Sequence, residues 1–135
     1  MKYWLAKSEP KKYSWDDFVS EGRDYWDGVR NYQARNNLSA MKIGDRVLFY
    51  HSVTGKEVVG IAEVVREAYQ DPTTDDERWV AVDMVPVEKL ARPVTLADIK
   101  AEPALAEVPL VKQSRLSVVP LRASEYRKIL SLAKP

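Results

Sequence analysis

The sequence predicts an α+β fold built around a central, mostly antiparallel β-sheet that can curl into a small barrel. Two observations lead to this prediction. About five segments have the apolar alternation and the β-branched or aromatic content of strands, and short turns join several of them. Between and around these segments, shorter stretches open on residues that commonly cap helices.

Each expected strand is bounded by turn residues. The first carries two aromatic side chains and a leucine and ends at Ser8-Glu9-Pro10. The turn at residues 54–56 joins the second and third strands into a hairpin, and Pro120 restricts the last strand to a sheet edge or to a strand end. The expected strands are residues 2–7, 46–51, 58–66, 79–87 and 115–121.

The expected helices are identified by their caps. Ser14 and Asp17, three residues apart, form a capping box, and Gly22 ends the helix that follows. Three further caps are expected: Asn31 for a helix that ends at about residue 41, Thr95 for residues 96–100, and Ser124 for residues 125–132.

Length and charge limit the function. A chain of 135 residues is the size of one domain, and we expect a single domain over residues 1–135. Lysine plus arginine is 21 and aspartate plus glutamate is 20, so the net charge is +1. Proteins that hold duplex DNA through many phosphates have a clear basic excess, so nucleic-acid contacts here are expected to be local. The acidic residues Asp71, Asp75, Asp76 and Glu77 are expected to be solvated surface.

Residue types that support metal binding or catalysis are scarce. The chain has no cysteine and one histidine, His51, so we expect no metal and no cofactor. The glycine-rich phosphate motifs are missing, and His51 and Ser52 point to opposite faces of a strand, which places them badly for proton transfer. These features favour a binding protein over an enzyme. No segment resembles a secretion signal or a membrane span, which favours a cytoplasmic protein without a membrane partner.

Residues 25–36 form the most unusual segment. Aromatic rings, arginines and side chains with oxygen acceptors follow one another there, and these groups stack on and hydrogen-bond to heterocyclic bases. A structural role is also open, in which Trp26 is a core residue and Arg30 pairs with Asp27. The other tryptophans, Trp4, Trp15 and Trp79, are expected in the core.

Several segments resemble, in order, the characteristic sequence of EVE domains. They are WLAKSEP (4–10), YSWDD (13–17), WDGVRNYQARN (26–36), MKIGD (41–45), FYHS (49–52), VGIAEV (59–64), YQDPT (69–73) and RLSV (115–118). Together they extend over almost the whole chain, which is similar to the bacterial single-domain members and to the thymocyte nuclear protein family. The resemblance implies a PUA-like fold, a curled five- or six-stranded sheet or barrel flanked by short helices.

The resemblance also implies a function. EVE domains are related to YTH and SRA domains, which take a modified base out of a nucleic acid into a pocket. The implied ligand is a modified cytosine, 5-methylcytosine or 5-hydroxymethylcytosine, in DNA. An RNA-binding PUA-like module, a small-molecule-binding protein and a weak enzyme are the alternatives. Lys7, Ser8 and Trp26 match positions that form the pocket of YTH domains.

The predicted site has a base pocket and a set of backbone contacts. The pocket residues are Lys7, Ser8, Trp26, Asp27, Val29, Asn31, Tyr50 and His51. Trp26 is the expected stacking ring, and Asp27 and Asn31 are expected to hydrogen-bond to the base edge. Tyr50 and His51 lie on alternate faces of one strand, so at most one of them lines the pocket. The expected phosphate or backbone contacts are Arg30, Arg35 and Arg115.

Overall fold

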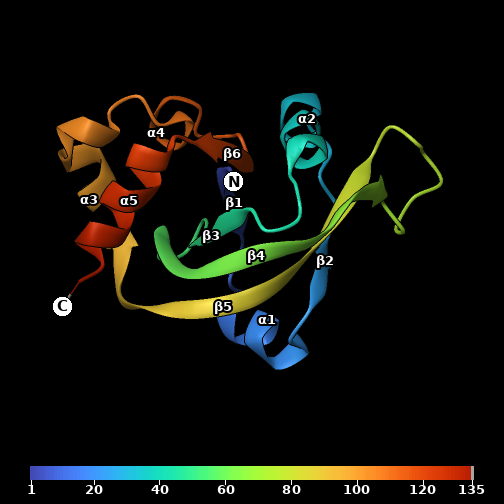
Figure 1. Ribbon diagram of the computed structural model, residues 1–135, viewed down its shortest axis with the longest axis horizontal. Coiled ribbons are helices and arrows are strands. Elements are labelled where there is room, and N and C mark those ends of the chain that lie inside the picture. Colours follow the sequence, from blue (N-terminus) through green and yellow to red (C-terminus); the bar gives the residue numbers. More distant parts are fainter. Residues whose placement is uncertain (135) are drawn as a thin grey trace.

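The computed structural model describes residues 1–134, which form six strands, five α-helices and one 3₁₀ helix (Figure 1). The strands are β1 (Tyr3–Ser8), β2 (Asp24–Trp26), β3 (Arg46–His51), β4 (Glu57–Gln70), β5 (Val80–Thr95) and β6 (Val118–Leu121). The helices are α1 (Trp15–Glu21), α2 (Tyr32–Ala40), α3 (Leu96–Ala101), the 3₁₀ helix (Pro103–Leu105), α4 (Pro109–Lys112) and α5 (Ala123–Leu132). Among residues 1–134, no helix is both long enough and apolar enough to cross a bilayer.

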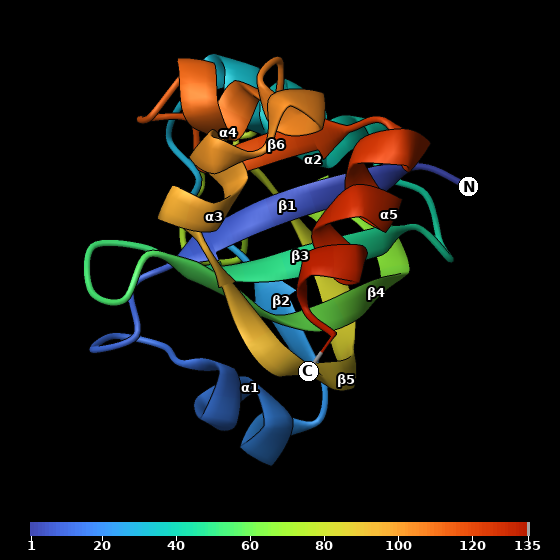
Figure 2. The same ribbon diagram turned by 90° about the vertical axis from the view of Figure 1, so that its left-hand side faces the viewer.

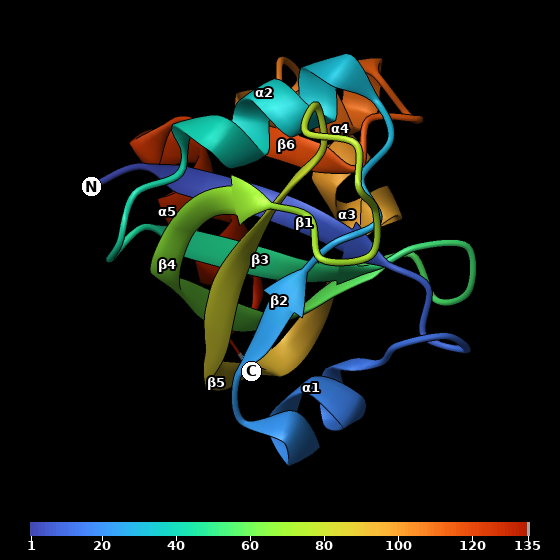
Figure 3. The same cartoon turned by 90° about the vertical axis from the view of Figure 1, so that its right-hand side faces the viewer.

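All six strands belong to one sheet in the order β2-β5-β4-β3-β1-β6. Neighbouring strands are antiparallel except β1 and β3, which are parallel. The sheet curls strongly (Figures 2 and 3) but stays open, with β2 and β6 at its two edges. The predicted α+β class and the mostly antiparallel, six-stranded sheet are confirmed, and the curl stops short of a closed barrel.

Helices surround the sheet unevenly. α3, α4 and α5 gather on one side, whereas α1 lies apart from them at the end of the molecule opposite α2 (Figures 1 and 2). The predicted caps of α1, α2 and α3 are confirmed. The prediction for α5 is wrong, because its N-cap is Arg122 and not Ser124. Glu125 determines this boundary, since its carboxylate accepts the backbone N–H of Arg122 at 2.8 Å.

The β4–β5 hairpin is longer than predicted. β4 has 14 residues and β5 has 16, and their pairing shifts register at several points. Pro86 lies at one of these shifts, and Pro93 lies within another. A bulge tolerates a residue that lacks an N–H, so these prolines bend β5 without ending it.

Strand β2 and two short helical segments are absent from the predicted elements. β2 has three residues, which is too few to show a period, and it forms by pairing with residues 82–84 of β5. The 3₁₀ helix and α4 each begin at a proline in a region without an amphipathic pattern. Both segments belong to the connection between α3 and β6.

An aromatic cluster fills the core near the end of β3. The ring of Phe49 stacks on Phe18 at 5.4 Å and meets the rings of Trp15 and Trp26 edge-on, each at 5.5 Å. A Cβ atom at Gly60 would lie 2.5 Å from the ring of Trp15, so the strand needs a glycine there to admit this ring. The cluster anchors Trp26 from the inside of the molecule.

The predicted core positions of Trp4 and Trp15 are confirmed, since both side chains are buried. The prediction for Trp79 is wrong. Trp79 is only partly buried, at the end of the loop between β4 and β5, and its ring packs against Tyr32 at 5.2 Å. The loop folds over α2 rather than into the core, so its tryptophan finds an aromatic partner at the surface.

Candidate functional site

A pocket of about 310 Å³ opens between the end of β1, the loop before α1 and strand β2. This volume is near the lower end of the range for sites that bind small ligands. The lining residues are Lys7, Ser8, Tyr13, Asp24, Tyr25, Trp26 and Asp27. The pocket therefore brings together four of the predicted pocket residues, Lys7 and Ser8 from the end of β1 and Trp26 and Asp27 from the end of β2 and the residue after it.

Trp26 connects this pocket to the core. The side chain is partly buried, lines the pocket and meets Phe49 at 5.5 Å with the two ring planes nearly perpendicular, at 86°. The two roles weighed for this residue, core packing and pocket wall, are thus combined in one side chain. A change at Trp26 is expected to affect both stability and ligand binding.

The two carboxylates of the pocket differ in their partners. Asp24 accepts the hydroxyl of Tyr13 at 2.6 Å and the backbone N–H of Tyr25 at 2.8 Å. The Asp27 carboxylate receives no hydrogen bond from another residue within the described part of the chain, 1–134. Burial, together with the negative charge of Asp71, raises the pKa of Asp27. Asp27 is therefore the carboxylate that is available to a ligand.

The donors of the pocket come from the end of β1. The Nζ atom of Lys7 donates to the carbonyl oxygen of Ser114 at 2.7 Å, and its remaining N–H groups are free to reach a ligand. Burial lowers the pKa of Lys7. The hydroxyl of Ser8 donates to the carbonyl oxygen of Tyr13 at 2.5 Å, which leaves its oxygen as an acceptor. Among residues 1–134, no group of three acidic or histidine side chains is arranged to hold a metal ion.

The other four predicted pocket residues lie outside this lining. Val29 and Tyr50 are buried in the core. Asn31 caps α2 with its side-chain oxygen. His51 accepts the backbone N–H of Trp15 through Nε2 at 3.0 Å, and burial lowers its pKa, which keeps the ring neutral. These contacts are structural, and sequence spacing alone does not distinguish them from pocket contacts.

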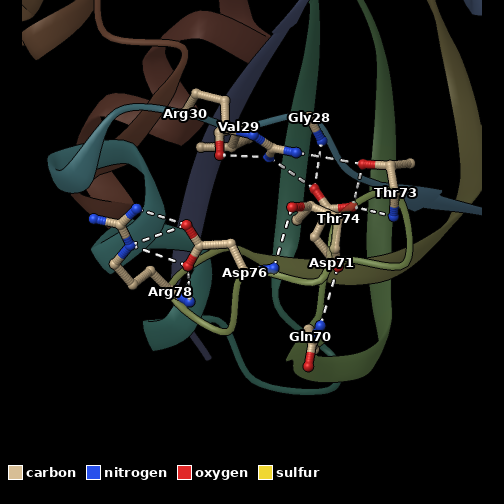
Figure 4. A network of polar contacts seen from close by, with 9 residues as sticks. All are labelled: Gly28, Val29, Arg30, Gln70, Asp71, Thr73, Thr74, Asp76 and Arg78. Carbon is tan, nitrogen blue, oxygen red and sulfur yellow. Dashed lines mark hydrogen bonds and ion pairs between the residues drawn. The ribbon is translucent and has the colours of Figure 1, made fainter.

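The residue that pairs with Arg30 is Asp71, at 2.9 Å, and not Asp27 (Figure 4). Asp71 was expected at the solvated surface with its acidic neighbours, and this expectation is wrong, since Asp71 is completely buried. It also accepts the backbone N–H of Gly28 at 2.9 Å and both the backbone N–H and the hydroxyl of Thr73.

These hydrogen bonds determine the charge state of Asp71. Burial alone would raise its pKa, but the donors of Thr73, Gly28 and Arg30 outweigh burial and lower the pKa to about 2. Position 28 favours glycine, because the backbone there is left-handed, with φ of 71°. The Asp71 carboxylate thus holds the chain directly after Asp27 in one conformation.

The two remaining arginines have different surroundings. Arg35 lies over the ring of Tyr32 at 5.1 Å and donates to Asn36, away from the pocket. Arg115 lines a neighbouring hollow of the surface that it shares with Lys7. Of the three predicted backbone contacts, Arg115 is therefore the one in a hollow that adjoins the pocket.

Three lining residues are absent from the sequence-based site: Tyr13, Asp24 and Tyr25. Tyr25 is the first residue of the aromatic segment at residues 25–36, so the composition of that segment already indicated Tyr25 as a candidate for the pocket. Tyr13 and Asp24 join the pocket because the loop before α1 folds back onto β2, where their side chains share a hydrogen bond. No local pattern reports such a contact between a loop and a three-residue strand.

Comparisons with known proteins give a consistent result. A model of the EVE domain family matches residues 2–132. Thymocyte nuclear protein 1 of Mus musculus is 38% identical over 96% of this chain and 73% of its own length. A crystal structure of an Agrobacterium tumefaciens protein is similar with a TM-score of 0.97 and 46% identity, over 98% of this chain and 93% of the other.

Two further solved structures hold nucleic acid. Human THYN1, in complex with DNA containing 5-methylcytosine, matches with a TM-score of 0.93 and 33% identity over 100% of this chain and 99% of the other. The YTH domain of Zygosaccharomyces rouxii MRB1, in complex with N6-methyladenosine RNA, matches with a TM-score of 0.64 and 21% identity. The second likeness concerns the fold alone.

Proposed function

The chain belongs to the EVE domain family, and on this premise we propose that it binds nucleic acid by taking a modified cytosine of DNA into the pocket beside Trp26. Its fold is PUA-like. The complex of human THYN1 with DNA that contains 5-methylcytosine supports the ligand class. The proposed base is 5-methylcytosine or 5-hydroxymethylcytosine.

The observation that carries this proposal is the unpaired Asp27 carboxylate beside an aromatic wall. Cytosine presents an amino group, N4, as a donor, and aspartate is a matching acceptor. In the proposed pose, a cytosine stacks on Trp26 with its N4 at Asp27, and its acceptors, N3 and O2, face donors such as Lys7 Nζ, which lines the same pocket. Thymine carries an oxygen in place of N4, so it would set two acceptors against each other at Asp27.

The aromatic lining suits the modification as well. A methyl or hydroxymethyl group at C5 lies next to N4 on the ring of the base. The rings of Tyr13, Tyr25 and Trp26 line the same pocket as Asp27, so they offer apolar contacts to that substituent. A buried methyl group contributes about 0.8 kcal/mol, which is a preference of about fourfold over cytosine.

We propose binding without chemistry. Cleaving or modifying a base needs a nucleophile beside a general base. The hydroxyl of Ser8 donates to a backbone carbonyl, and His51 is used by the backbone of α1. Neither side chain is therefore arranged as a nucleophile beside a general base, whereas the lining residues do offer stacking and hydrogen-bonding groups.

The experiment that tests this function replaces Trp26 by alanine. Stacking on an aromatic ring contributes roughly 1–3 kcal/mol per base, so Trp26→Ala should lower the affinity for a modified-cytosine oligomer by about five- to a hundredfold. The weaker binding of an unmodified oligomer should hardly change. Trp79→Ala is the matched control, because Trp79 is also a partly buried tryptophan but lies outside the pocket.

Melting curves of both variants separate binding from folding. Removal of a fully buried tryptophan costs about 3–5 kcal/mol, and the partly exposed Trp26 should cost less than that. A folded Trp26→Ala protein that keeps the preference for the modified base would contradict the proposal. RNA oligomers with the same modification belong in the panel, and tighter binding to RNA than to DNA would contradict the choice of DNA.

A further inference from the structure

A second hollow, of about 680 Å³, adjoins the pocket, and Lys7 lines both. It lies between the turn after β3 and the segment that precedes β6. Three cationic side chains and three serines account for most of its lining: Lys7, Lys56, Arg115, Ser52, Ser114 and Ser117.

The cations of this hollow have no carboxylate partner in the part of the folded chain that the structure describes. None of its three cations forms an ion pair with a carboxylate within residues 1–134, whereas Arg30 and Arg78 are paired with Asp71 and Asp76. Glu9 is the carboxylate in the lining, and Lys12 lies 3.5 Å from it. The hollow therefore combines hydroxyl donors with positive charge that the folded chain leaves uncompensated.

The polar surface continues beyond Arg115. Ser114 and Arg115 also line a third hollow of about 330 Å³, together with Lys112, Gln113, Asn31 and Gln33. The hydrogen bond from Lys7 Nζ to the Ser114 carbonyl joins this segment to the pocket. Three adjoining hollows thus follow one another from the base pocket toward the start of α2.

We propose that the hollow around Lys56 and Arg115 binds the phosphates of the nucleic-acid strand that flanks the base held in the pocket. This inference rests on the proposed function. A base that enters the pocket brings its own backbone to the pocket mouth, and the phosphates on one side then meet unpaired ammonium and guanidinium groups. Contacts of this kind fix the register of the strand but do not read its sequence.

The geometry favours a nucleic-acid strand over an acidic peptide. The lining combines three cations with three serine hydroxyls, which suits phosphates, each with several acceptor oxygens. Lys7 belongs to the base pocket and to the phosphate hollow at once. A ligand that fills both sites must carry a base and a backbone phosphate in direct succession, and a nucleotide strand does so.

The test is a double variant, Lys56→Gln with Arg115→Gln. The control is Lys89→Gln with Arg127→Gln, which removes the same charge from two exposed residues that form no ion pair within residues 1–134. α5, which carries Arg127, lies far from the turn after β3 (Figure 2). Both variants are titrated with a single-stranded DNA oligomer containing one 5-methylcytosine, over a range of salt concentrations, and with the nucleoside 5-methyl-2′-deoxycytidine.

The Lys56/Arg115 variant should bind the oligomer about five- to thirtyfold more weakly at low salt. The slope of log affinity against log salt should shrink by about 1.4, since each phosphate contact on a single strand contributes about 0.7. Binding of the nucleoside, which has no phosphate, should not change. The control should keep both the oligomer affinity within about twofold and the salt slope of the original protein.

Equal slopes for the two variants would overturn the phosphate hollow while leaving the base pocket intact. A changed slope in a protein that never prefers the modified base would support the hollow as a nucleic-acid groove and refute the proposed function. Poly-glutamate is included as a competitor, and displacement of the oligomer by poly-glutamate at equal charge would refute a nucleic-acid ligand for this surface.

Discussion

Replacing Asp71 by asparagine removes one negative charge and leaves the size of the side chain unchanged. All four groups that contact the Asp71 carboxylate are donors: two from Thr73, one from Gly28 and one from Arg30. Whichever way the asparagine amide is turned, its NH₂ group faces at least one backbone N–H. The variant therefore loses hydrogen bonds in a completely buried position and leaves Arg30 without its counter-charge.

The loss of stability can be worked out from the pKa. Asp71 has a pKa of about 2 in the folded protein, against about 3.9 in an unfolded chain, and this difference corresponds to about 2–3 kcal/mol. Because the folded pKa is the lower one, this contribution is present above about pH 4 and is lost as the pH falls toward 2. At pH 7, Asp71→Asn should lower the melting temperature by roughly 8–12 °C.

Unfolding by urea at pH 7 and at pH 2.5 tests this reasoning. Asp71→Asn should be about 2–3 kcal/mol less stable at pH 7, and the gap should narrow strongly at pH 2.5, where the original carboxylate is close to its own pKa. Asp75→Asn is the matched control, since Asp75 is an exposed neighbour on the same loop, and it should change stability by less than about 0.5 kcal/mol. A gap that is absent at pH 7, or that does not depend on pH, would refute the reasoning.

Three further predictions concern packing, pH and salt. Gly60→Ala should destabilise the protein by about 1–3 kcal/mol in urea unfolding, because the added methyl would lie 2.5 Å from the Trp15 ring; unchanged or higher stability would show that the strand can move away. His51 has a lowered pKa in the folded protein, so its contribution to the free energy of unfolding is present above about pH 6.5 and is lost as the pH falls. The difference in stability between the original protein and His51→Gln should therefore shrink from pH 7.5 to pH 5, and a difference that widens would be inconsistent with a neutral ring. With a net charge of +1, binding to unmodified duplex DNA should show a slope of about −2 to −4 in log affinity against log salt, and a slope near −8 would reveal a broad basic face.

The sequence was informative wherever a local pattern decides the structure. The caps at Ser14, Asn31 and Thr95 and the hairpin turn at residues 54–56 lie where they were predicted, because each depends on a few adjacent residues. Pro120 lies in β6 at the sheet edge, as a residue without an N–H requires. Such features can be recognised without knowledge of the tertiary structure.

The parts that were mispredicted or absent depend on distant partners. β2 exists because β5 pairs with it, and Tyr13 reaches the pocket through Asp24. Asp71 lies among exposed acidic residues in the sequence, but the fold buries it against Gly28 and Arg30. The resemblance pointed to Lys7, Ser8 and Trp26, and Asp27 was a candidate for its acceptor oxygens. The loop before α1 and strand β2 supply the remaining lining.

Affinity for two oligomers that differ by one methyl group tests the proposed function most directly. The original protein is titrated with a single-stranded DNA containing one 5-methylcytosine, with the same strand containing cytosine, and with the same strand containing thymine. Single strands avoid the unpairing of a duplex base, which costs a few kcal/mol and is independent of the pocket. We expect 5-methylcytosine to bind about fourfold more tightly than cytosine, and thymine to bind more weakly than 5-methylcytosine because it presents an acceptor to Asp27. Equal affinity for all three strands would contradict a base-reading pocket beside Trp26.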